Sequence, residues 1–350
     1  MVLDVKELLC RTELTKEDFL LLMLSPMGKQ ALEEYGNIVA VDGSGGTTVY
    51  KHMQMIAFVV ANAGRSTVVA VAYVLSERED VYAAVFAVLK LWAPKWFLRG
   101  VQSDLAFAPF NAATLLQERH ELWGEGVVIR WFFCLWHLKR AVRAQLIQLL
   151  ARPKLDLEAE WGKVRTAIYQ LVMRIIGDRR DKHGFRNLRH ANLAEMECDI
   201  AVLRRLLITY RQFEALQYLN TYLFGKDGGR IAYWAPFARL EFALVHRKDE
   251  VREKTRSDGV HAINIPSILV VNMYLEAFFK IIKHLVLKGR QGNRLDVVTG
   301  GVVSFFKRDI MKLIALPVAA LLPCGDDIDE ATVDSRIESA LTREVALHSA

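Results

Sequence analysis

The most constraining feature of the chain is a change of pattern near residue 78, where three consecutive strand-like runs give way to alternating helices and strands. Residues 37–42, 51–61 and 67–75 are rich in β-branched and other apolar residues, and Gly64-Arg65 falls between the last two runs. A tight turn between two such runs is typical of a β-hairpin. The sequence therefore predicts a sheet that begins with three consecutive strands, paired antiparallel.

The segment that follows alternates between helical and strand-like stretches. Helical periodicity covers residues 79–92, 106–120 and 135–150, and strand-like runs cover residues 96–103 and 126–133. Strands that enter a sheet through crossover helices lie parallel to their neighbours. The order β-β-β-α-β-α-β-α therefore predicts an α/β protein with a ribonuclease H-like mixed sheet.

The rest of the chain is predicted to be mainly helical. Leucines at roughly helical spacing, among them Leu14, Leu20 and Leu24, predict short helices before the sheet. Strand signals nearly vanish after Pro153, and a helical pattern returns over residues 265–287. We therefore expect an N-terminal helical segment (1–36), the first part of a core (37–152), a helical basic insertion (153–262) that interrupts it, the last helices of the core (263–315) and an acidic tail (316–350).

Charge and cysteine content limit the classes of function. The net charge is +6, and residues 151–260 hold 21 Lys and Arg against 15 Asp and Glu, so the entire excess lies in this middle third. A local basic excess suits a phosphate-backbone partner, although solvated surfaces also carry one. The four cysteines form no disulfide framework and no CxxC pair, which favours a reducing compartment. We expect no membrane partner because the most apolar stretch, residues 56–75, is interrupted by a turn.

Two acids stand at strand ends that the expected fold places side by side. Asp42 ends the first strand and Asp104 follows the fourth. Two carboxylates held that close repel one another unless a cation lies between them, and Mg²⁺ or Mn²⁺ prefers such oxygen ligands. Two divalent ions about 4 Å apart can activate a nucleophile and stabilise the leaving oxygen of a phosphodiester. The alternative is that each Asp is an ordinary turn residue, as in Asp42-Gly43.

A third acid that could complete this site is Glu276, which lies in the middle of an apolar helical run. A Glu with so many apolar neighbours is rarely buried without a partner. Asn272 lies one turn earlier on the same helix face and could orient it. The alternative is a surface pair between Glu276 and Lys280, four residues further on.

Five segments, in this order, resemble the transposases of Mutator-like elements. They are VDGSGGTTVYK (41–51), GRSTVVAVAYVLSERED (64–80), QSDLAFAPFNA (102–112), WFFCLWHLKRAV (131–142) and NMYLEAFFKIIK (272–283). The resemblance covers residues 37–311 and implies a ribonuclease H-like DDE core with a helical insertion before the last acid. It also implies that Asp42, Asp104 and Glu276 are the catalytic and metal-binding acids, with two Mg²⁺ or Mn²⁺ ions as cofactors.

The resemblance assigns roles to further residues. Cys134 and His137 match the family's C-x₂-H element, and we expect them, together with Asn272, to position the acids or the substrate. Trp234 and Arg239 lie in a segment similar to the aromatic and Arg segment that precedes the last acid of the family. Two alternatives stay open for Cys134 and His137: half of a zinc site, or a packed cysteine beside a surface histidine.

Candidate DNA-binding residues gather mainly in the expected insertion. Its basic run over residues 179–190 suits a DNA backbone, and the alternative is a solvated loop. Trp234 is expected either to stack on an unpaired base or to be buried in the core. The expected DNA contacts are Arg179, Arg180, Lys182, Arg186, Arg189, Trp234, Lys280 and Lys283.

The sequence thus leads to the hypothesis of a DNA transposase, which cleaves phosphodiesters at element ends and joins the freed 3′-hydroxyl to target DNA. Its partners would be double-stranded DNA and further copies of the chain in a homo-oligomer, and its location would be the nucleus of a eukaryotic host. The alternative is a domesticated or decayed relative that binds DNA as a regulator without strand transfer. The intact trio of acids favours the enzyme.

Overall fold

The chain divides into two compact units, which are described separately. One holds residues 1–45 and 52–279, and the other holds residues 46–51 and 280–350. The computed structural model describes residues 19–307 except for 46, 51, 63–64, 105, 151–157, 177–178, 181–185, 188–189, 191, 226–229, 247–251, 256–260, 265–272 and 289–292.

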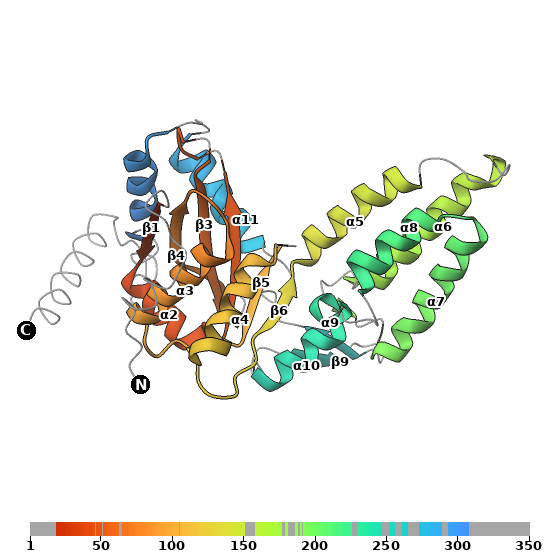
Figure 1. Cartoon of the computed structure of the whole chain (residues 1–350), viewed down its shortest axis with the longest axis horizontal. Coiled ribbons are helices and arrows are strands. Elements are labelled where there is room, and N and C mark those ends of the chain that lie inside the picture. Colours follow the sequence, from red (N-terminus) through yellow and green to blue (C-terminus); the bar gives the residue numbers. More distant parts are fainter. Residues whose placement is uncertain are drawn as a thin grey trace, which may run out of the picture. The chain divides into compact units, whose positions relative to one another are not determined.

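A mixed six-stranded sheet forms the centre of the first unit (Figure 1). Its strands are β1 (Leu20–Leu24), β2 (Ile38–Ser44), β3 (Gln54–Asn62), β4 (Arg65–Val74), β5 (Gly100–Ser103) and β6 (Arg130–Phe133), in the order β1-β4-β3-β2-β5-β6. β2, β3 and β4 pair antiparallel, whereas β5 joins β2 and β6 joins β5 in parallel. The expected α/β class with a mixed sheet is therefore confirmed.

The strand β1 corrects the expectation of a helix in this part of the N-terminal segment. Leu20 to Leu24 pair antiparallel with β4, at the edge of the sheet. Pro26 starts the following helix α2 (Pro26–Tyr35), and the Ser25 side chain caps it by accepting a hydrogen bond from Gly28 N at 2.8 Å. A proline disfavours helical geometry in the residue before it, so a helix cannot run from the leucines into α2. Residues 20–24 instead pair with the side of β4 that faces away from β3.

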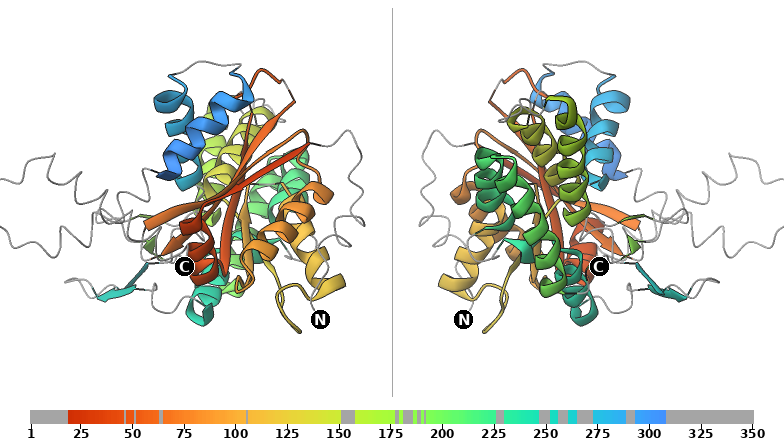
Figure 2. Two further views of the ribbon diagram at one scale, coloured as in Figure 1. Left: turned by 90° about the vertical axis from the view of Figure 1, so that its left-hand side faces the viewer. Right: turned by 90° about the vertical axis from the view of Figure 1, so that its right-hand side faces the viewer.

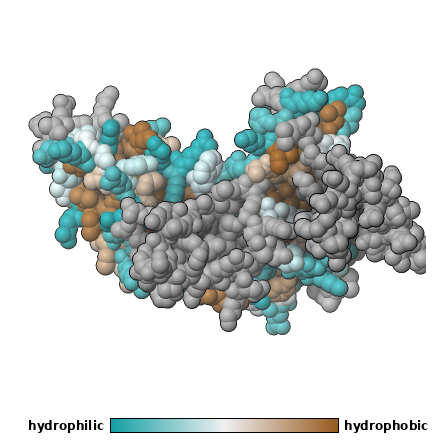
Figure 3. Space-filling view, turned by 180° about the vertical axis from the view of Figure 1, so that it is seen from behind, coloured by the Kyte–Doolittle hydropathy of each residue, from teal (hydrophilic) through white to brown (hydrophobic). Residues whose placement is uncertain are grey.

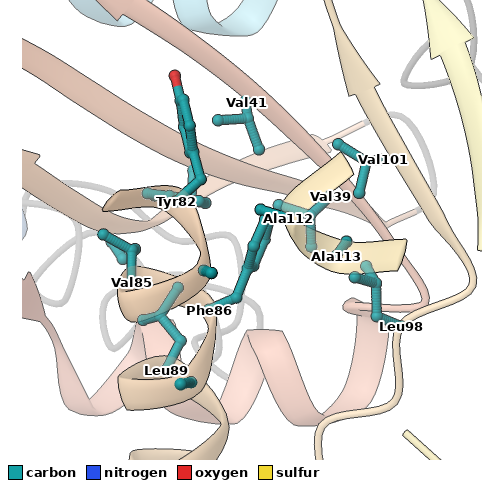
Figure 4. Close-up of a cluster of buried hydrophobic side chains, with 14 of the residues drawn as sticks. Val39, Val41, Tyr82, Val85, Phe86, Leu89, Leu98, Val101, Ala112 and Ala113 are labelled. Atoms are coloured by element: carbon teal, nitrogen blue, oxygen red, sulfur yellow. The ribbon is translucent and has the colours of Figure 1, made fainter. Parts of the chain in front are cut away.

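Three helices cover one face of the sheet and enclose its core. They are α2, α3 (Glu79–Trp92) and α4 (Ala108–His120), and their apolar side chains pack against those of β2, β3 and β4. Figure 4 shows side chains of α3 and α4 pointing toward Val39 and Val41 of β2. Phe86 lies between aromatic neighbours, with its ring centroid 5.8 Å from that of Phe58 and 6.3 Å from that of Trp123. Figure 2 shows the twist of the sheet that these helices follow.

The next helix, α5 (Leu135–Leu149), leads from β6 into a helical region that belongs to the same unit as the sheet. That region contains α6 (Glu158–Ile176), α7 (Leu193–Thr209), α8 (Phe213–Tyr218), the π-helix η1 (Leu219–Phe224), α9 (Ile231–Trp234) and α10 (Pro236–His246). α6 and α7 lie side by side, and the Arg174–Asp199 ion pair joins them at 2.8 Å. Two short hairpins were not expected here: β7 (Arg179–Arg180) with β8 (Arg186–Asn187), and β9 (Arg252–Thr255) with β10 (His261–Asn264).

A buried arginine ties the helical region to the sheet. Arg239 of α10 has no exposed surface, and its guanidinium donates hydrogen bonds to Phe133 O at the end of β6 and to Tyr233 O and Trp234 O. Asn37 Nδ2 makes a second link by donating to His246 O at 3.0 Å. The region therefore packs against the strand that precedes Cys134.

The end of the described chain is helical. α11 (Met273–Lys280) is followed in the second unit by the π-helix η5 (Ile281–Val286) and by a helix over residues 295–307. The described parts of the segment 263–315, where helices were expected, thus include α11, η5 and the helix over residues 295–307. In the same unit, Val49 N donates to Asn293 O at 2.8 Å.

No helix in the described ranges is long and apolar enough to cross a membrane. On the face in Figure 3, apolar and polar residues mix in small groups.

Candidate functional site

The ends of three parallel strands create the candidate site. β2 and β5 run parallel, with Ala40 opposite Gln102, and β6 is parallel to β5, with Ser103 opposite Phe133. Two residues further along this register, Asp42 comes level with Asp104. Strand pairing therefore fixes the backbone that carries both acids. They lie where β2, β5 and β6 end, at the carboxyl-terminal side of these strands, which is called the sheet edge from here on.

Three side chains meet at this edge. Asp42, His137 of α5 and Glu276 of α11 each present a ligand atom, and these atoms all lie within 4.8 Å of one another. His137 Nε2 lies 3.3 Å from Glu276 Oε1. Helix α11 thus brings Glu276 to Asp42 across 234 positions of sequence, so the structure brings these two acids together as expected. The alternative of a surface pair between Glu276 and Lys280 does not account for this placement.

Asp104 stands beside this group without belonging to it. Its Oδ1 accepts a hydrogen bond from Ala106 N at 2.8 Å, which turns the carboxylate toward its own loop. Its charge nevertheless acts on Asp42, His137 and Glu77. The Asp104 side chain is partly exposed, and the structure leaves it outside the group of three ligand atoms.

The charges of the group are balanced internally. Burial, then the charges of Asp104 and Glu276, raise the pKa of Asp42 to about 7, against the opposing effects of His137 and of the hydrogen bond from Gly43 N. Burial acts to lower the pKa of His137, but the Cys134 thiol and the two aspartates outweigh it and raise that pKa to about 9. At neutral pH the imidazolium therefore provides the positive charge that the carboxylates require.

A fourth acid, Glu77, lies at the same edge, and the sequence reasoning missed it. Its carboxylate packs over Gly43, because a Cβ atom at this glycine would fall 2.0 Å from Glu77 Oε1. Burial and the charge of Asp104 raise the pKa of Glu77, although its side chain still reaches solvent. The signal was its place three residues after β4, a strand that runs in the direction of β2.

The two residues of the C-x₂-H element lie in different surroundings. Cys134 is buried at the start of α5, whereas His137, one turn later, reaches the acids. Among the described residues, Asp42, His137 and Glu276 form the only metal-capable group of three or more such side chains, so these residues give no support to a zinc site that includes Cys134. His190, a buried histidine of the first unit, lies 3.1 Å from Asp199.

The expected DNA contacts have different outcomes. Trp234 is fully buried, and its Nε1 donates to Leu223 O at 2.9 Å, so the expectation that it stacks on a base is wrong and the core alternative holds. Lys280 is exposed and Lys283 is partly exposed. The backbones of Arg179, Arg180 and Arg186 lie in β7 and β8, but their side chains, as well as Asn272, Lys182 and Arg189, lie outside the described residues.

Comparison with known proteins adds no assignment. The sequence matches no protein-family model, and no curated protein is significantly similar to it.

Proposed function

We propose that the chain is a metal-dependent enzyme that cleaves DNA phosphodiesters, the catalytic domain of a transposase resembling those of Mutator-like elements. The observation that carries the proposal is the meeting of Asp42, His137 and Glu276 within 4.8 Å, with Asp104 level with Asp42 on the neighbouring strand. Residues from three distant parts of the sequence converge there. A cluster of ionisable side chains that includes a carboxyl group with a raised pKa is typical of a functional site.

The strand order supports the finer fold in this proposal. In a ribonuclease H-like sheet the first strand is central, with an antiparallel pair on one side and parallel strands on the other. β2 has this position: β3 and β4 lie on one side and β5 and β6 on the other. The ends of β2 and β5 are then the edge at which such a core places its acids.

The residues fit a pair of Mg²⁺ or Mn²⁺ ions. Asp42, Asp104 and Glu276 offer the hard oxygen ligands that these ions prefer, and burial, followed by the charges of Asp104 and Glu276, raises the pKa of Asp42, as expected for a carboxylate that a bound cation would stabilise. Bound there, two ions would activate a water or 3′-hydroxyl and stabilise the leaving oxygen.

The protein's own groups position the reaction. β2 and β5 hold the two aspartates in fixed register, which limits the reorganisation needed during the reaction. His137 orients Glu276 through their 3.3 Å contact, and its protonated ring can also donate to a phosphate oxygen. The basic residues of the helical region would hold double-stranded DNA, and a homo-oligomer in the nucleus would bring two element ends together.

The test is nicking of a supercoiled plasmid, and of a labelled duplex that carries the element's own ends, by purified protein with Mg²⁺ or Mn²⁺. Asp104→Asn preserves size and removes one charge, so we expect at least a hundredfold loss of nicking with unchanged or slightly stronger DNA binding. Asp296→Asn, on an exposed acid outside the site, is the matched control and should cleave normally.

Two results would contradict the proposal. Nicking that survives Asp104→Asn and Asp42→Asn alike would remove the proposed site. If the unmutated protein binds DNA but shows no metal-dependent nicking, the domesticated regulator becomes the better description.

A further inference from the structure

One tryptophan, Trp136, lies directly before His137 of the candidate site and is exposed. Five of the seven tryptophans are buried, and those at positions 96, 131 and 234 also donate an indole hydrogen bond. Trp136 is 45% exposed, although its neighbours Leu135 and Leu138 in the first turn of α5 are buried. An exposed indole contributes little to the core and is available for contact with a ligand.

Trp136 is connected to the acids through a single residue. Its ring centroid lies 4.7 Å from that of His137, and the two rings meet edge to face. His137 Nε2 in turn lies 3.3 Å from Glu276 Oε1. A group stacked on the indole would therefore lie next to the residue that contacts the carboxylates.

The surroundings of this indole are cationic. The Arg140 guanidinium lies 5.3 Å from the ring centroid, over the indole, and Arg143 is exposed one turn further along α5. Lys139, directly before Arg140, is partly exposed, and α5 contains no acidic residue from its first to its last position. A flat aromatic face bordered by arginines is the combination that holds single-stranded nucleic acids, because bases stack and phosphates pair with the cations.

We infer that Trp136 is a stacking platform for an unpaired DNA base next to the phosphate held at the acid site, with Arg140 and Arg143 pairing with the adjoining backbone. This inference rests on the proposed function, because it takes the position of the phosphate from it. The base must be unpaired, since both faces of a base inside a duplex are already covered by its neighbours. The platform therefore favours substrates with a frayed, flipped or overhanging nucleotide.

The test compares two labelled probes by fluorescence anisotropy with Ca²⁺, a divalent ion that takes the same oxygen ligands, and gel analysis establishes that the probes stay uncut during the measurement. One probe is a blunt DNA duplex, and the other is the same duplex with a short single-stranded 3′ overhang. Trp136→Leu should weaken binding of the overhang probe about fivefold to 150-fold, the range for the loss of one stacked base, and leave the blunt probe unchanged. Trp136→Phe keeps an aromatic face and should retain most of the affinity.

Trp92→Leu is the matched control. Trp92 is the other exposed tryptophan, 41% exposed, and it ends α3, whereas Glu77 of the candidate site lies before the start of that helix. This variant should bind both probes like the unmutated protein. Circular dichroism and the melting temperature of each variant establish that the fold is retained.

Three outcomes would overturn the inference: equal losses on both probes, no loss on either, or a Trp136→Phe variant as weak as Trp136→Leu. Plasmid nicking, measured in parallel, keeps the two proposals apart. A Trp136-dependent preference for the overhang without nicking would support the platform and count against the enzyme. Normal nicking without that preference would do the opposite.

Discussion

The sheet edge and the helical region of the first unit are built on different principles. At the edge, β2 and β5 fix Asp42 and Asp104 through backbone register, and the supporting core is fully buried on the α3 side. In the helical region, residues 158–246, the helices are joined in part by exposed polar contacts such as the Arg174–Asp199 pair. Chemistry that needs a fixed geometry suits the first arrangement, and a surface that follows a long, variable ligand suits the second.

The largest loss of stability is expected from a substitution of Arg239, which joins the helical region to the sheet. Arg239→Ala removes a buried guanidinium and leaves the carbonyls of Phe133, Tyr233 and Trp234 without their donor. We expect a loss of about 3–5 kcal/mol in the free energy of unfolding, because several buried polar groups lose their partner at once. Urea denaturation, followed by circular dichroism, measures it.

Arg239→Lys sharpens this result. Lysine keeps the charge but cannot bond three carbonyls in a planar fork, so its loss should lie between zero and that of Arg239→Ala. If Arg239→Ala unfolds with the midpoint of the unmutated protein, the two regions do not depend on this link.

The second effect concerns the sheet edge alone. Asp42 has a pKa of about 7 in the folded protein and about 4 in an unfolded chain, so the folded state retains a proton that the unfolded state releases. Metal-free protein should therefore lose stability as pH rises from about 4 to 7. Asp42→Asn cannot titrate, and at pH 8 without metal it should be more stable than the unmutated protein by about 2–4 kcal/mol.

Added Mn²⁺ should reverse this order. It stabilises only the protein with an intact site, by mass action, so the melting temperature of the unmutated protein should rise while that of Asp42→Asn stays constant. Differential scanning fluorimetry between pH 5 and 8 gives both results. A metal-free protein whose stability does not change over this range would contradict the burial assigned to Asp42.

The smallest loss of stability is expected from a substitution within the helical region. Asp199→Asn breaks the ion pair with Arg174 and weakens the contact with His190, which together hold α7 against α6. Burial acts to raise the pKa of Asp199, but His190 and Arg174 outweigh it and lower that pKa, so the stabilisation is present above about pH 4 and is lost as pH falls below it.

The expected cost of Asp199→Asn at pH 7 is about 1 kcal/mol, typical of a partly exposed pair. The difference from the unmutated protein should shrink toward pH 3. DNA nicking should be unaffected, and a large loss of nicking would show that the helical region controls the geometry of the acids.

Local sequence signals predicted most of the fold. Hairpin residues, helical periodicity and short apolar runs placed β3, β4 and α3 nearly at their observed bounds, because each signal is complete within about fifteen residues. The strand β1 was not predicted because its five residues, four leucines and one methionine, fit a helix as well as an edge strand, and only pairing with β4 decides between them. Burial of Trp234 likewise depends on helices distant in sequence.

The sequence predicted only part of the candidate site, because some of its contacts depend on how elements distant in sequence pack together. Asp42 and Glu276 were paired through an expected fold, and the structure brings them together. The direct contact of His137 with Glu276 depends on how α5 and α11 approach each other, which no local pattern contains. Glu77 was missed because its role depends on its packing over Gly43.

The most direct test of the central claim is an anomalous-scattering map from crystals of the protein soaked in Mn²⁺. We predict a peak bounded by the carboxylates of Asp42 and Glu276, with Asp104 rotated away from Ala106 N to join them, and no such peak in Asp42→Asn crystals. A map with no peak at these acids, or with its peak at Cys134, would contradict the account.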